Sequence, residues 1–262
     1  MRRVLSILSA ALACLVLPLA AAANCLPIVQ NQPRVIPARF DLASVPKGSV
    51  SLSFLGHASW LIETPGGITA VTDYNGWIKP PRLPDIVTMN RAHSSHYTDA
   101  PEPEIKHVLR GWRDDGGMAQ HFLKLGDMRV RNIPTNIRSY AGTIRNGNSI
   151  FVFEAGDLCV AHLGHLHHTL TDTHLTELGA IDIVLAPVDG GYTLDQEGMM
   201  EVLQQIKAPL IMPMHFFSNA TLARFLEAAA KHYTIEHHPS PTIVLSREEL
   251  PKTPTVRVLP GF

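Results

Sequence analysis

The feature that most constrains the fold is a set of short apolar strands that each end in a loop bearing histidine. Residues 85–89 run into His93 and His96, residues 158–163 end at a run of histidines, and residues 210–214 end at His215. In α/β folds, binding sites gather at the carboxyl ends of strands. We therefore expect these histidines to surround one pocket.

The order of the expected elements indicates two sheets. Short strands, punctuated by glycine and proline, are predicted at residues 51–55, 60–63, 68–72, 85–89, 125–133, 149–154 and 158–163. From residue 171 onward, helices at 171–178, 195–206 and 220–231 alternate with strands at 181–187, 210–214, 233–236 and 242–246. Strands first and β/α alternation afterwards suit two sheets with helices on their outer faces.

The N-terminus has the pattern of a secretory signal peptide. Two arginines precede an apolar run over residues 4–23, and the run ends in small residues. A membrane anchor is the alternative, but Pro18 and the alanine-rich end argue against it. We expect cleavage near Ala23, a secreted or periplasmic protein without a stable membrane anchor, and a single domain over residues 24–262.

Charge and cysteine content limit the classes of binding partner and bear on the redox state of the compartment. The chain has 22 basic and 23 acidic residues, so nothing recruits nucleic acid or an anionic membrane, and we expect a small-molecule substrate. The oligomeric state is left open. Cys14 leaves with the signal peptide, so Cys25 and Cys159 can pair in an oxidising compartment; the alternative is that Cys159 is simply a small buried residue.

Histidine is the residue type that carries the chemistry. Of 14 histidines, four lie within residues 162–168, a density that packing does not explain. Imidazole is the commonest metal ligand, and several converging imidazoles suit a transition metal. We expect one such ion, zinc first, with copper, iron or manganese as alternatives. Side chains alternate at a strand end, so His165 with His167 or His168 is expected to bind, and His162 to support the ligands.

Several segments resemble the metallo-β-lactamase superfamily, in the branch related to L-ascorbate 6-phosphate lactonase. They are residues 55–59 with His57, Asp73, residues 85–96, 161–166, 187–195 and 213–215. The resemblance covers nearly all of the expected mature chain. It implies an α/β protein with a four-layer αββα sandwich and a metal site at one edge between the sheets. Asp73 and His57 match family positions and are expected to support the site.

The ligand signature of that family is altered in this chain. The pattern His-x-His-x-Asp-His falls on residues 91–96, where Arg91 and Ser95 replace the first histidine and the aspartate. The family's metal-bridging aspartate falls on His165. A cation at Arg91 disfavours a second metal ion, so we expect a mononuclear site. Its expected ligands are His93, His96, His165 and His215, with His167 and His168 beside them.

The resemblance implies a hydrolase that uses water activated by the metal. We expect a small ester, lactone, phosphoester or amide as substrate. Arg91 is expected to bind developing negative charge, and Asp189 or Asp99 to move the proton. The alternatives are a periplasmic metal-binding protein without hydrolytic activity and a degenerate family member. β-Lactam hydrolysis has only the family name in its favour.

Overall fold

The computed structural model describes residues 45–261, which form two stacked β-sheets. The predicted signal peptide and Cys25 lie outside the described residues, so cleavage and pairing with Cys159 stay predictions. The first sheet has the order β13-β1-β2-β3-β4-β5. Its strands are β1 (Ser49–Gly56), β2 (Ser59–Glu63), β3 (Thr69–Val71), β4 (Ile86–Met89), β5 (His107–Arg110) and β13 (Thr242–Ser246).

The second sheet has the order β12-β14-β11-β10-β9-β8-β7-β6. Its strands are β6 (Phe122–Leu125), β7 (Met128–Ser139), β8 (Gly142–Ala155), β9 (Leu158–His162), β10 (Ile183–Pro187), β11 (Leu210–Met214), β12 (Thr234–His237) and β14 (Thr255–Val258). The strands from β6 to β9 pair antiparallel, whereas β9, β10, β11, β14 and β12 pair parallel. Because β10 and β11 are buried on both faces, they read as continuous apolar runs in the sequence.

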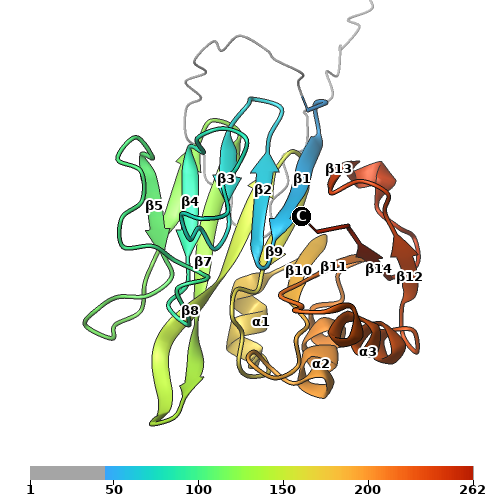
Figure 1. Cartoon of the computed structure of the whole chain (residues 1–262). Helices are drawn as coiled ribbons and strands as arrows, with labels where there is room; N and C mark the ends of the chain where they lie inside the picture. The colour runs from blue at the N-terminus through green and yellow to red at the C-terminus, as the bar shows by residue number, and fades with distance from the viewer. Residues whose placement is uncertain (1–44, 262) are drawn as a thin grey trace, which may run out of the picture.

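Helices α1 (Asp172–Leu178), α2 (Gln196–Ile206) and α3 (Asn219–Ala229) follow the strands of the parallel part, and a short 3₁₀ turn, η1 (Arg247–Glu249), follows β13. Each α-helix begins after a residue whose side chain accepts a backbone N–H of the first turn: Thr171, Asp195 and Ser218. Figure 1 shows the three helices together on one side of the second sheet. None of the described helices is long and apolar enough to cross a membrane.

Two apolar layers follow from the alternation of side chains along the strands. On β10, Ile183 and Leu185 face the layer between the sheets, whereas Val184 and Ala186 face the helices. The layer between the sheets also contains Trp60, which is fully buried. The site described below lies at strand ends anchored by these two layers.

The α/β sandwich agrees with the expected architecture. The layer outside the first sheet differs, because it consists of loops and not of helices. The outer face of the first sheet buries Tyr74, Ile105 and Trp112, which lie in segments without helix. Within residues 45–261, the α-helices lie against the second sheet only. Loop residues therefore cover the face where the outer helical layer was expected.

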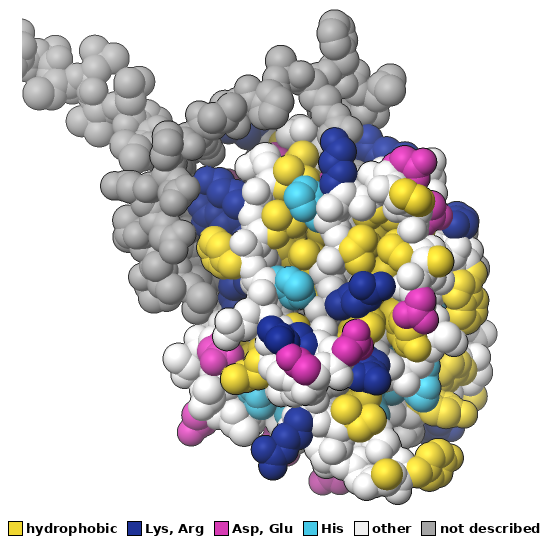
Figure 2. Space-filling view, turned by 90° about the vertical axis from the view of Figure 1, so that its left-hand side faces the viewer, with side chains coloured by type: hydrophobic (Ala, Val, Ile, Leu, Met, Phe, Trp, Pro, Cys, Tyr) yellow, Lys and Arg dark blue, Asp and Glu magenta, His cyan; other side chains and the backbone are white. Residues whose placement is uncertain are grey.

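Most predicted elements are present, and the differences have local causes. The strand expected at 125–133 is a hairpin, because Gly126 adopts φ 53° and turns the chain between β6 and β7. The hairpin of β7 and β8 is longer than predicted and extends beyond the sheet (Figure 1). β5 and β14 were not predicted. The face at the β5 edge mixes basic, acidic and apolar side chains (Figure 2).

Candidate metal centre

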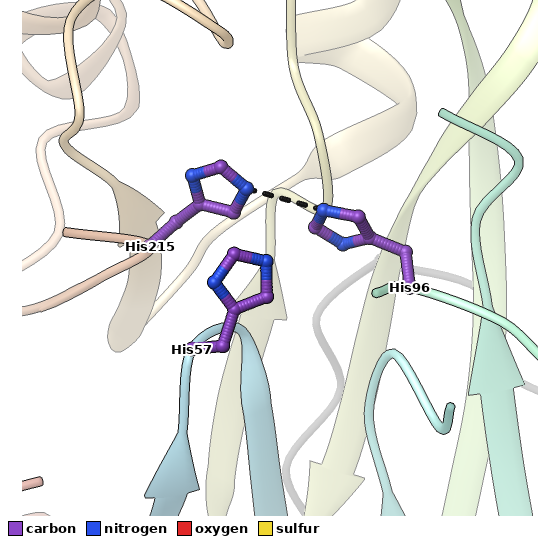
Figure 3. A group of neighbouring side chains, drawn as sticks. All are labelled: His57, His96 and His215. Carbon is purple, nitrogen blue, oxygen red and sulfur yellow. Dashed lines mark hydrogen bonds between the residues drawn. The ribbon is translucent and has the colours of Figure 1, made fainter. Parts of the chain in front are cut away.

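Three histidines from distant parts of the chain converge at one end of the sandwich. His57 lies in the turn between β1 and β2, His96 in the loop after β4, and His215 directly after β11. Their candidate ligand nitrogens all lie within 4.8 Å of one another. The Nε2 atoms of His96 and His215 are 3.1 Å apart, and the His57 ring points toward this pair from the turn below (Figure 3).

Buried carboxylates orient two of these rings. The Nδ1 of His96 lies 2.6 Å from Oδ2 of Asp73, and the Nδ1 of His215 lies 2.9 Å from Oδ2 of Asp189. Such carboxylate contacts fix the tautomer and direction of a metal-binding imidazole. In the neutral tautomer that donates Nδ1–H to its carboxylate, each ring has its lone pair on Nε2, directed toward the other ring.

The two carboxylates are themselves held in place. Burial alone would raise the pKa of Asp73, but the hydrogen bonds from His96 and from the amide of Asn90 lower it. The pKa of Asp189 is also lowered against burial, by hydrogen bonds from His215, Thr193 and the backbone. Both carboxylates are therefore anionic at neutral pH.

This donor set fits a transition-metal ion. Two lone pairs 3.1 Å apart repel each other unless a proton or a cation lies between or beside them. Two nitrogens bound to one tetrahedral zinc ion, each about 2.0–2.1 Å from it, are about 3.3 Å apart. Burial lowers the pKa of His57 to about 3, so this ring is neutral at pH 7. Neutral imidazole is the form that binds metal.

Backbone strain is concentrated at the same place. His57, Asp73 and His215 have φ values of 52°, 43° and 55°, a region that residues other than glycine rarely adopt. The backbone N–H of His215 donates to the carbonyl of His57 over 2.7 Å, which ties two of the strained turns together. Such strain persists where the surrounding fold enforces it, and it clusters at functional sites.

The structure places His165 and His93 beside the three-histidine group. The His165 ring is fully buried, with ring centres 4.7 Å from His96 and 4.9 Å from His215. His93 is exposed, 4.9 Å from the His165 ring and 6.4 Å from His96. Thus the four residues expected as ligands lie together, and His57, expected only to support them, lies among the converging nitrogens.

The remaining histidines of the 162–168 run point elsewhere. His162 is buried, and its nitrogens bond to the Ala58 carbonyl and the Gly164 N–H. His168 bonds to the backbone of Asn136 and Thr169, so both of its nitrogens are engaged away from the centre. His167 contacts His165 at 2.5 Å. Burial and Arg138 lower the pKa of His167 to about 4.

The residues expected to handle charge and protons lie in different surroundings. Arg91 and Asp99 are exposed on the loop around His96. Asp189 accepts five hydrogen bonds, one from His215 and four from residues 191–193, which makes it an orienting carboxylate. Its oxygens are occupied by these contacts, so the proton-transfer role expected for Asp189 has no support in its geometry.

Two aromatic side chains beside the centre were not predicted from the sequence. Tyr192 and Phe217 are 64% and 58% exposed, and their ring centres are 5.3 Å apart. Phe217 lies 5.1 Å from the His215 ring and Tyr192 lies 6.3 Å from His93. Both residues lie in the loops after β10 and β11, next to the metal-site motifs. That position in the sequence could have indicated that they lie beside the centre.

Comparison with known proteins identifies the family. The model of a family described as "Beta-lactamase superfamily domain" matches residues 51–215. A UPF0173 metal-dependent hydrolase of Methanosphaerula palustris is 24% identical over 184 residues, which cover 63% of this chain and 83% of the relative. Another protein of that name, from Thermoplasma volcanium, is 32% identical over 151 residues, which cover 51% of this chain and 66% of the relative.

Solved structures agree with the fold. A crystal structure from Thermotoga maritima, described as that of a candidate Zn-dependent hydrolase of the metallo-β-lactamase superfamily, has a TM-score of 0.61 and 26% identity. The match covers 81% of this chain and 100% of the Thermotoga maritima chain. Igni18, a metallo hydrolase of Ignicoccus hospitalis, has a TM-score of 0.54 at 19% identity over 76% of this chain and 99% of its own, and so supports the fold alone. This chain belongs to the metallo-β-lactamase superfamily.

Proposed function

We propose that this protein is a metal-dependent hydrolase with one transition-metal ion, zinc first, held by His96, His215 and His57. One observation carries the proposal. Two imidazoles, each oriented by a buried carboxylate, direct their Nε2 atoms at each other across 3.1 Å. Relatives named metal-dependent hydrolases, and a structural neighbour described as a candidate Zn-dependent hydrolase, support the reaction class.

The proposed substrate is a small ester, lactone, phosphoester or amide. In ester or lactone hydrolysis, a water oxygen forms a bond to the carbonyl carbon, the bond to the leaving oxygen breaks, and that oxygen takes a proton. A bound transition metal supplies Lewis acidity and lowers the pKa of water. The protein's part is to hold neutral imidazoles in place through Asp73 and Asp189.

The residues at the rim have roles that fit their exposure. His93 is an exposed imidazole next to His165, so it can receive the proton of water and pass it to the leaving group. Arg91, exposed on the same loop, can attract an anionic substrate. These assignments place proton transfer on His93 and not on Asp189.

A second candidate function is metal binding without hydrolysis. Serine and histidine occupy the two places where the family signature has carboxylates, Ser95 and His165, and Ser95 bonds to His57 over 3.2 Å. A centre rich in neutral imidazole is also what a copper- or zinc-carrying protein uses. Stoichiometric metal uptake without turnover of any substrate would favour this alternative.

Metal analysis and hydrolysis assays together test the proposal. The chain is purified without chelator, and its metal content is compared with that of His96→Ala and His215→Ala. His232→Ala, which changes an exposed histidine, is the matched control. We expect one ion per chain in the wild type and the control, loss of the ion in the two variants, and ester or lactone hydrolysis that chelator abolishes and zinc restores. Hydrolysis that persists after complete metal removal would overturn the proposal.

Export stays part of the proposal. Residues 1–23 have the pattern of a signal peptide, so the protein is proposed to act in the periplasm or outside the cell. N-terminal sequencing of the mature protein from its native host, together with fractionation, checks this. A mature chain that keeps residues 1–23 contradicts it.

A further inference from the structure

One nitrogen at the candidate centre is buried without a hydrogen-bond partner. His165 is fully buried, and its Nε2 contacts no hydrogen-bonding atom of the described residues. Buried polar atoms are nearly always paired, so an unpaired one at a functional centre points to a ligand atom that completes it. His165 is also not a member of the group whose nitrogens converge within 4.8 Å.

The protonation of the neighbouring His167 follows from a backbone contact. The backbone N–H of Arg138 donates to Nδ1 of His167 over 2.6 Å. A backbone amide in this position can only donate. Nδ1 of His167 therefore carries a lone pair, and the proton of this ring is on Nε2.

The same reasoning extends to His165. The Nε2 of His167 lies 2.5 Å from Nδ1 of His165, so His167 donates and His165 accepts. A ring that accepts at Nδ1 carries its proton on Nε2. The unpaired Nε2 of His165 is thus an N–H group, which cannot bind a metal ion and can only donate.

We propose that His165 acts as a hydrogen-bond donor to the substrate through Nε2–H, in a tautomer fixed by Arg138 and His167. The proposal rests on the proposed function, and it replaces the expectation that His165 is a metal ligand. The partner it fits is an acceptor oxygen of the substrate, the carbonyl of an ester or lactone or the oxygen of a phosphoryl group. Negative charge develops on that oxygen during hydrolysis, and a fixed donor in a buried place stabilises it.

The backbone around His165 has the rigidity that such a donor requires. Its own N–H donates to Oδ1 of Asn148 over 2.7 Å. The preceding Gly164 has φ 60°, and a Cβ there would lie 2.4 Å from Nδ2 of Asn90. The side chain of Arg138 binds the carbonyls of Gly191 and Thr193, which holds the hairpin end that supplies the Arg138 N–H.

Zinc titration separates a donor from a ligand. Zn²⁺ affinity is measured for the wild type, His165→Ala, His165→Gln and the control His232→Gln. We expect the affinity of all four to agree within about threefold. Loss of a ligand would instead weaken zinc binding by tenfold or more, and that result in both His165 variants would overturn the inference. Circular dichroism shows whether each His165 variant folds. If one of them does not, the zinc affinity of the other tests the inference.

Turnover gives the complementary readout. His165→Ala is expected to lower kcat about 10²–10³-fold, the usual effect of removing one such donor. His165→Gln keeps an N–H at a similar distance from the backbone and is expected to recover at least tenfold of this loss. Equal activity of His165→Ala and the wild type would contradict the donor role.

Nitrogen NMR of the metal-free protein reads the tautomer directly. With ¹⁵N-labelled histidine, we expect the His165 proton on Nε2, and a mixture of tautomers in His167→Phe. A proton on Nδ1 in the wild type overturns the inference whatever the activity. A wild type that shows the expected tautomer but neither binds zinc nor hydrolyses a substrate instead overturns the proposed function.

Discussion

His96 and His215, 119 positions apart in the sequence, direct their Nε2 atoms at each other across 3.1 Å. Their rings are nearly parallel, with an interplanar angle of 17°. One aspartate holds the Nδ1 side of each ring: Asp73 for His96 and Asp189 for His215. The side-chain amide of Asn90 donates to Asp73, whereas backbone N–H groups of residues 191–193 donate to Asp189. The pair thus depends on contacts in both sheets, which makes its geometry sensitive to residues that never touch a metal.

The supporting carboxylates are expected to set metal affinity. Asp73→Asn and Asp189→Asn keep the shape of the side chain and remove its charge. We expect each to weaken Zn²⁺ binding about 10–100-fold, the usual range for such supporting residues. Competition titration with a chromophoric chelator measures the change, and Asp99→Asn, at an exposed position, is the control. Unchanged affinity in both buried variants would show that the carboxylates do not support a metal site.

Metal binding is expected to stabilise the fold. A ligand at 100 times its Kd adds about 2.7 kcal/mol to the free energy of unfolding. Thermal unfolding followed by circular dichroism should therefore show a higher Tm with excess Zn²⁺ and a lower Tm after chelation. His215→Ala should show neither response. A Tm that zinc does not change in the wild type would argue that the three-histidine group binds no ion.

The sequence predicted the elements that are locally encoded. Residues 210–214 are five consecutive buried residues that run into His215, and β11 has those bounds. β5 went unpredicted because the strand has only four residues, follows Lys106 and ends in Arg110. Its pairing with β4 stabilises it in the folded protein. The convergence at His57 depends on long-range pairing, since the backbone of its turn accepts the His215 N–H.

The histidine run shows where sequence reasoning on the site reached its limit. His167 and His168 were expected to bind metal because of their density, yet the backbone of β7 engages both rings. That engagement requires the long hairpin of β7 and β8, whose length is set by cross-strand pairing over 128–155. Spacing alone cannot show that a backbone N–H from residue 136 or 138 reaches these rings.

Gly164 is expected to be essential to the geometry of the centre. With φ 60° and a Cβ that would lie 2.5 Å from Oδ1 of Asn148, Gly164→Ala combines backbone strain with overpacking. Overpacking alone costs about 1–3 kcal/mol. Gly116→Ala is the matched control, because Gly116 has φ +75° and a Cβ there would meet no atom within 4 Å. Urea unfolding should show the larger loss at Gly164, and equal losses would contradict the steric argument.

The metal-free protein should lose stability as pH falls below neutrality. Burial lowers the pKa of His57 to about 3, and burial with Arg138 lowers that of His167 to about 4, from 6.5. Below pH 6.5 the unfolded chain binds protons that the folded chain does not, so stability present above that pH is lost on acidification. The slope is up to about 1.4 kcal/mol per pH unit for each such histidine.

His167→Gln tests this pH dependence. It removes one of the histidines that the folded protein keeps neutral, so the free energy of unfolding of the metal-free variant should depend less steeply on pH between 6.5 and about 4. Urea unfolding at several pH values measures the slope. His237→Gln, at an exposed position on β12, is the control for loss of a histidine. A slope in His167→Gln as steep as in the wild type would mean that His167 titrates alike in both states.

The aromatic pair beside the centre is expected to set substrate preference. Tyr192 and Phe217 are exposed, and their rings lie next to His93 and His215, so an apolar group on a substrate can pack against them. One aromatic contact contributes about 0.5–1.5 kcal/mol beyond area burial, which corresponds to roughly 2–13-fold in kcat/KM. Tyr192→Ala and Phe217→Ala should therefore lower kcat/KM for aryl esters by that factor and leave acetyl esters nearly unchanged. Tyr140→Ala, fully exposed at the far end of the β7–β8 hairpin, controls for loss of an aromatic ring. Equal losses of kcat/KM for aryl and acetyl esters would contradict a role in substrate preference. They would indicate that the substitutions disturb the histidines of the centre, because such damage slows the hydrolysis of every substrate alike.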